Sequence, residues 1–147
     1  MNEFICYFEC LSYGRTTKCI MKKLALFGRS KNAQQEFNKF MVYIETNQPT
    51  CFQIKYPRKD YSPRIDECTS TIWERKLNVV KEKPLFLEVF VTNPTAIKNL
   101  NCDVKVDELN ADNEVIKTSS FSFKAGLKLQ DWKWEKFEVK SILDYTA

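Results

Sequence analysis

The sequence contains no histidine among its 147 residues, and only 3 glycines. Without histidine the chain cannot build Ser-His-Asp or Cys-His nucleophile pairs, a histidine general base or a histidine-ligated zinc site. Gly14, Gly28 and Gly126 do not stand in any glycine-rich nucleotide-binding motif or nucleophile elbow. We therefore predict that the protein is not an enzyme and uses no cofactor.

Long apolar runs are also missing. No run approaches the roughly 20 residues that a membrane-spanning helix needs. The first residues carry Glu3 and Glu9 instead of a basic region, and a start at Met21 leaves too short an apolar stretch before Gly28 for a secretion signal. We therefore expect a cytoplasmic protein that does not contact a membrane, and we leave open whether translation starts at Met1 or Met21.

Cysteine is present, at positions 6, 10, 19, 51, 68 and 102. Because no export signal accompanies these residues, we expect free, mostly buried thiols rather than disulfides. Cys6, Cys10 and Cys19 could join a fourth cysteine around zinc, but their C-x3-C-x8-C spacing lacks the two C-x2-C knuckles of zinc ribbons. We predict no metal site there.

Carboxylates cluster around one predicted hairpin near residues 103–114. They do not follow the order of an EF-type calcium loop, so we interpret them as a solvated acidic turn. The residues concerned are Asp103, Asp107, Glu108, Asp112 and Glu114.

Alternation with period 2 dominates the chain from residue 50 onward. The run 85–92 (LFLEVFVT) is apolar on both faces and predicts a central strand. The run 100–106 (LNCDVKV) alternates cleanly, which predicts one face on the core and one in water. Between them stands Val-Thr-Asn-Pro, a strand ending that is common in immunoglobulin-like sandwiches. Residues 50–147 are therefore predicted to form an antiparallel β-sandwich, immunoglobulin-like in general architecture.

One segment favours a helix. The run NAQQEFNKFMVYIET predicts an amphipathic helix near residues 32–46, because Phe37, Phe40, Met41 and Ile44 recur at helical spacing. The alternative is that MVYIE begins a strand, since its β-branched and aromatic residues favour sheets. We predict an α+β, mainly β fold: one domain over 1–147, with strand and helix elements in 1–49 and the sandwich in 50–147.

The last predicted strand, 131–139 (DWKWEKFEV), changes register. Trp132 and Trp134 share one face, whereas Phe137 and Val139 take the other. We expect a β-bulge that brings all four side chains to the core; without a bulge the tryptophans face away from it.

Charge and aromatic residues indicate a binding surface. The net charge is +4, with the basic excess in residues 1–65, which points to a partner with an acidic surface. A predicted polar loop over 57–70 follows a short strand, and the segment 55–64 interleaves basic and aromatic side chains. Tyrosine and arginine are typical of protein interfaces. We predict partner contacts from Lys55, Tyr56, Arg58, Lys59, Tyr61 and Arg64.

The leading hypothesis is therefore a non-enzymatic protein-binding module, such as an inhibitor, a toxin-immunity-type protein or an assembly subunit. The first alternative is a nucleic-acid-binding protein, in which the same cations contact phosphates and the tyrosines stack on bases. The third reading is phosphate binding or an unrecognised enzyme at Arg29, Ser30 and Lys31, which lie between a predicted strand and the predicted helix. The oligomeric state stays open.

Overall fold

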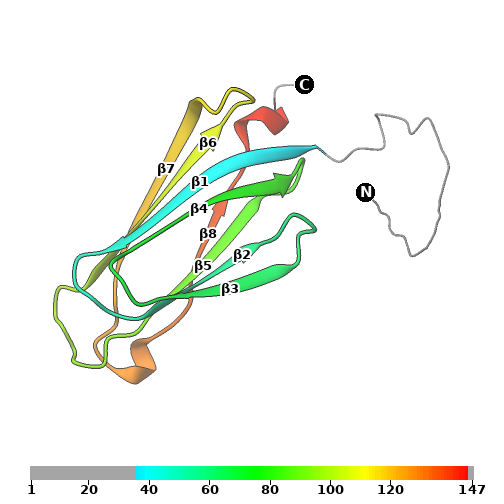
Figure 1. Ribbon diagram of the computed structural model, residues 1–147. Coiled ribbons are helices and arrows are strands. Elements are labelled where there is room, and N and C mark those ends of the chain that lie inside the picture. Colours follow the sequence, from blue (N-terminus) through cyan, green and yellow to red (C-terminus); the bar gives the residue numbers. More distant parts are fainter. Residues whose placement is uncertain (1–35, 146–147) are drawn as a thin grey trace, which may run out of the picture. The chain divides into compact units, whose positions relative to one another are not determined.

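The computed structural model of the chain describes residues 36–145, which form two antiparallel four-stranded sheets (Figure 1). The strand order is β4-β1-β6-β7 in one sheet and β3-β2-β5-β8 in the other. The strands are β1 (Phe37–Thr46), β2 (Phe52–Pro57), β3 (Pro63–Cys68), β4 (Ile72–Val80), β5 (Leu85–Val91), β6 (Asn101–Leu109), β7 (Val115–Lys124) and β8 (Glu135–Val139). This sandwich-like arrangement agrees with the predicted mainly β fold.

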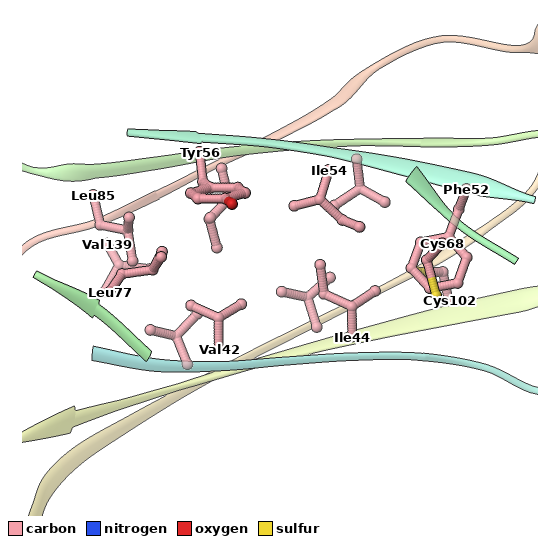
Figure 2. Packing of buried hydrophobic residues seen from close by; sticks show 14 of the residues in the cluster. Val42, Ile44, Phe52, Ile54, Tyr56, Cys68, Leu77, Leu85, Cys102 and Val139 are labelled. Atoms are coloured by element: carbon pink, nitrogen blue, oxygen red, sulfur yellow. The ribbon is translucent and has the colours of Figure 1, made fainter. Parts of the chain in front are cut away.

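The core lies between the two sheets. Figure 2 shows Val42 and Ile44 of β1 pointing toward Ile54 and Tyr56 of β2. The predicted alternation of β2 is confirmed, because Ile54 is buried whereas its neighbour Lys55 is only half-buried. The predicted alternation of residues 100–106 is confirmed as well, whereas the end of β6 after Val106 is buried on both faces. In these alternating stretches one of two successive side chains enters the core and the other lies on the outer face.

The helix predicted near residues 32–46 is wrong for residues 37–46, which form strand β1. Phe40, Val42 and Ile44 are completely buried, with a period of 2. Phe40 and Ile44 fit both a helical and a strand period, and pairing with β4 on one side and β6 on the other selects the strand. Residues 32–35 lie outside the described residues. The sandwich begins at residue 37 rather than 50, and the single-domain organisation stays a prediction.

Helical structure is limited, within the described range, to the 3-10 helices η2 (Leu129–Asp131) and η3 (Ile142–Tyr145). The predicted central position of 85–92 is confirmed, since β5 lies between β2 and β8. Its Leu87 and Val89 are fully buried, whereas Phe86 on the opposite face is 49% exposed.

The tryptophans do not reach the core. The β5–β8 register is regular, so the expected bulge is absent from this pairing. Phe137 packs against the core and Val139 is buried, but Trp132 and Trp134 precede β8 and lie against Phe90 on the outer side, with ring centroids 6.4 and 5.4 Å away. Aromatic stacking outside the core replaces the expected burial.

The acidic turn is solvated only in part. Asp112 and Glu114 are exposed, but Asp107 and Glu108 on β6 are 6% and 1% exposed. A register shift at Glu108/Leu109 lies at the end of the β6–β7 pairing. Glu108 faces the interior, where it accepts hydrogen bonds from the hydroxyl of Ser141 and from the backbone N–H of Ile142. Burial of these carboxylates contradicts the interpretation of a solvated cluster.

Cys51, Cys68 and Cys102 are free thiols, and the last two are buried. Burial raises the pKa of the Cys102 thiol to about 12. Cys6, Cys10 and Cys19 lie outside the described residues. Within residues 36–145 no group of three or more Cys, Asp or Glu side chains is arranged to hold a metal ion.

Thiol accessibility provides a first prediction. The denatured, unreduced chain should show six free thiols with a colorimetric thiol reagent. In the native protein at pH 8, Cys102 should react only as fast as the protein unfolds, because it is buried and its pKa keeps it protonated. The half-buried Cys51 should react without unfolding, although its hydrogen bond to Glu67 raises its pKa and slows it. A denatured count of two or fewer would contradict free thiols.

Candidate functional site

The segment 55–64 forms a hairpin rather than a long loop. Strand β3 pairs with β2 from Pro57–Pro63 to Phe52–Cys68, so the polar loop predicted over 57–70 is wrong for residues 63–68. Most of β3 is exposed at the edge of its sheet, and such a polar edge strand lacks the alternation that marks a strand in sequence. The turn is tight: Arg58 N–H donates to Ser62 and Tyr61 N–H donates to Arg58.

The structure brings four of the six predicted contact residues together. Tyr56, Arg58, Lys59 and Arg64 line a surface hollow of about 190 Å³, which we call the basic hollow. Lys55 and Tyr61 lie elsewhere. Lys55 is on the outer face of its sheet, 3.8 Å from Glu88, and the Tyr61 hydroxyl donates to the carbonyl of Pro84 (2.7 Å).

Strand β4 of the other sheet supplies the rest of the basic hollow. Arg75 and Lys76 line it, and sequence reasoning missed both. A signal was present in the sequence, because Arg75 has the same parity as Trp73 and Leu77 in an alternating run. A charged residue at an inward position indicates either a buried partner or a site. The basic hollow therefore combines residues of three strands, β2, β3 and β4, with the turn between β2 and β3.

Asp66 joins the two sheets beside the basic hollow. Its carboxylate accepts hydrogen bonds from the Tyr56 hydroxyl (2.9 Å), Arg64 Nε (3.1 Å) and Trp73 Nε1 (3.3 Å). Arg75 Nη1 lies 3.6 Å from the same group. We refer to these five residues as the Asp66 cluster. Because β2 and β3 belong to one sheet and β4 to the other, the Asp66 cluster links the two sheets at this edge through side-chain contacts.

The pKa of Asp66 reflects two opposing effects. Burial alone raises it, but the hydrogen bonds from Tyr56, Arg64 and Trp73 and the charge of Arg64 outweigh burial and hold the pKa below its ordinary value. Burial and the hydrogen bond to Asp66 raise the pKa of Tyr56. Asp66 is therefore a permanent anion at neutral pH, and Tyr56 keeps its proton.

The positive charge of the basic hollow is only partly neutralised. The Arg75 guanidinium lies 5.6 Å from the centre of the Tyr56 ring, and its side chain is 44% exposed. Arg58 and Lys76 are exposed and form no ion pair with any described residue. Five cationic side chains thus line the basic hollow, whereas two carboxylates lie near it: Asp66, and Asp60 of the β2–β3 turn, whose pKa is lowered mainly by hydrogen bonds from Ser62 and also by the charge of Arg58.

A second hollow, of about 360 Å³, lies near the C-terminal segment and differs in charge. Its lining combines Glu82, Glu138 and Asp144 with Lys83 and Lys140. Side chains of both signs face one another there, so this surface has no strong preference for a charged ligand. The basic hollow is the stronger candidate.

Arg29, Ser30 and Lys31, the predicted phosphate-binding turn, lie outside residues 36–145. Within that range no helix combines the length and hydropathy required to cross a bilayer.

Comparison of the chain with protein-family models, with curated proteins and with solved structures found no match. The fold and the site together define a sandwich-like all-β unit with a basic hollow at one edge, where the two sheets are joined by a carboxylate.

Proposed function

We propose that the protein is a non-enzymatic protein-binding module that binds an acidic partner through the basic hollow. The convergence of five cationic side chains, from the β2–β3 hairpin and β4, carries this proposal. Arginine and tyrosine are enriched among the residues that dominate protein interfaces. An inhibitor, a toxin-immunity-type protein and an assembly subunit are the kinds of module that we propose.

Preorganisation supports the same proposal. Arg64 and Arg75 are held by the Asp66 carboxylate before any partner arrives. Ordering a long side chain on binding costs about 0.5–1.5 kcal/mol, and this cost is reduced where the side chain is already held. Arg58 and Lys76 have no ion pair in residues 36–145 to lose when they meet an acidic group.

An immunoglobulin-like general architecture and a cytoplasmic location belong to the proposal. The consecutive strands β1 and β2 lie in different sheets, and so do the later consecutive strands β4 and β5. β4 pairs with β1, and β5 pairs with β2. Such interlocked pairing supports a Greek-key sandwich of the immunoglobulin type. Free Cys51, Cys68 and Cys102 support a reducing compartment.

Nucleic acid is the alternative ligand, and the tyrosines argue against it. Tyr56 is 3% exposed, which leaves no open ring face for a base. The ring of Tyr61 packs against the core, and Lys83 Nζ lies 5.5 Å from its centre. Binding would then depend on phosphate contacts alone. The third reading, phosphate binding or an unrecognised enzyme at Arg29, Ser30 and Lys31, concerns residues outside the described range.

Charge reversal in the basic hollow tests the proposal. Arg58→Glu should weaken capture of the partner from nuclease-treated native extract by about tenfold or more, because a cation that meets an acidic surface becomes repulsive. Lys124→Glu is the matched control, since Lys124 is an exposed lysine on β7, at the opposite edge of its sheet from β4, and should leave capture unchanged. Quantitative mass spectrometry of the captured material at moderate salt measures the ratio.

Two outcomes oppose the proposal. Recovery that disappears on nuclease treatment and falls steeply with salt supports the nucleic-acid alternative, because phosphate contacts release counterions. Equal recovery with wild type and Arg58→Glu would show that the partner does not bind at the basic hollow.

A further inference from the structure

The basic hollow has the chemistry of a phosphate site. Building on the function proposed above, we infer that it binds a phosphate monoester carried on a phosphorylated serine or threonine of the partner protein. The argument rests on the arginine geometry, the charge balance and the size of the basic hollow.

The two arginines of the Asp66 cluster keep free donors. Arg64 donates a hydrogen bond to Asp66 through Nε, and Arg75 forms an ion pair with Asp66 through Nη1. A guanidinium has five N–H donors in a planar fork, so each arginine contacts Asp66 with only part of its donors. Each side chain is nearly half exposed, at 47% and 44%. Asp66 therefore orients both forks and leaves other N–H groups available for the oxygens of a tetrahedral anion, which arginine binds in bidentate fashion.

Charge favours a dianion over a single carboxylate. A phosphate monoester carries about −1.5 to −2 charges at pH 7 and three strong acceptor oxygens, whereas Asp or Glu carries one charge. Arg58 on the hairpin and Lys76 on β4 add two cations without ion pairs to the two oriented arginines, and Lys59 adds a fifth cation. A phosphodiester of nucleic acid has a single charge and would lack base stacking here.

The size of the basic hollow is suitable. Its volume is about 190 Å³, whereas one water molecule takes up roughly 30 Å³ in the liquid. A phosphate group with part of its hydration shell fits such a space. Pro57 and Leu77 complete the lining beside the cations, and Asn78 adds an amide.

The first experiment uses inorganic phosphate as the probe. Phosphate is titrated into the full chain at constant ionic strength, and backbone amide NMR shifts are followed. Saturable shifts should concentrate in the β2–β3 hairpin and β4, and acetate should bind at least about tenfold more weakly because it offers one charge and one fork. Shifts spread evenly over surface lysines would overturn the site.

A double variant sharpens this test. Arg58→Gln with Lys76→Gln should weaken phosphate binding by about tenfold or more, since two charge-assisted contacts are lost. Neither side chain has an ion pair within residues 36–145, so the fold should be retained, and circular dichroism checks this. Lys124→Gln on β7 is the matched control. Unchanged affinity in the double variant would place phosphate elsewhere.

The second experiment separates this inference from the proposed function. Native extract is treated with a phosphatase before capture of the partner. Loss of capture supports a phosphorylated side chain as the ligand. Capture that resists phosphatase but is lost with Arg58→Glu leaves the protein-binding function standing and overturns the phosphate inference. Phosphate binding in the basic hollow without any captured partner supports the phosphate site and overturns the proposed function instead.

Discussion

Asp66→Ala is expected to lower the free energy of unfolding by about 2–4 kcal/mol at pH 7. The substitution removes the acceptor of three hydrogen bonds, from Tyr56, Trp73 and Arg64, and the counter-ion of Arg75. The Tyr56 hydroxyl is the costliest group to leave without a partner, because this residue is 3% exposed. Urea denaturation followed by tryptophan fluorescence measures the change.

The pH dependence of this loss follows from the low pKa of Asp66. The folded pKa is below the ordinary value of about 4, so the stabilisation by the carboxylate is fully present above that value. It is lost as the pH falls through the folded pKa. The stability difference between wild type and Asp66→Ala should therefore be large at pH 5–7 and shrink below pH 4.

Asp66→Asn is the matched control for shape. The amide keeps one acceptor oxygen, so we expect a smaller loss than with alanine, of about 1–2 kcal/mol at pH 7. A cost below about 0.5 kcal/mol for Asp66→Ala at pH 7 would show that the Asp66 cluster does not hold the sheets together.

Glu108→Ala is the second substitution with a large expected effect, a loss of about 2–4 kcal/mol. Glu108 on β6 is 1% exposed, and its carboxylate accepts from the Ser141 hydroxyl and from Ile142 N–H (2.9 Å). Alanine leaves both donors without this acceptor and opens a cavity. Because the segment after β8 is held to β6 through this side chain, we also expect faster amide hydrogen exchange at Ile142.

Two controls separate hydrogen bonding from packing at this position. Glu108→Gln keeps the volume and one carbonyl oxygen, so about half of the loss or less is expected. Ser141→Ala removes one donor while the carboxylate keeps Ile142 N–H as a partner. If Glu108→Ala and Glu108→Gln have equal effects, the lost charge rather than the cavity determines the cost.

The sequence predicted the mainly β fold and the sandwich because alternation survives wherever one face of a strand is buried. β2, β5 and β6 all follow this pattern. The prediction failed for β1, because Phe40 and Ile44 fit a helical period and a strand period equally well. Pairing with β4 and β6, which lie far along the chain, selects the strand. The prediction also failed for β3. Most side chains of this edge strand are exposed, so its sequence does not alternate between apolar and polar residues.

The candidate site was predictable only on the hairpin side. Arg58, Lys59 and Arg64 are close together in sequence, so their composition was visible. Arg75 and Lys76 enter the basic hollow through the packing of β4 beside the hairpin. The alternating run marks Arg75 as a charged residue at an inward position, but it does not encode which segment Arg75 meets. The tertiary role of Asp66 was equally hidden, because its donors come from three strands.

The central position of β1 has a consequence for biosynthesis. β1 is made before β2 to β8, yet it lies in the middle of its sheet, and its neighbours β4 and β6 are synthesised later. Until β6 leaves the ribosome, the nascent chain carries an apolar strand with at least one unpaired edge, through Phe40, Val42 and Ile44. Such an edge is a template for association between chains. Ribosome-bound chains that end before β6 should therefore be the ones that need chaperones, and this need should fall once β6 has emerged.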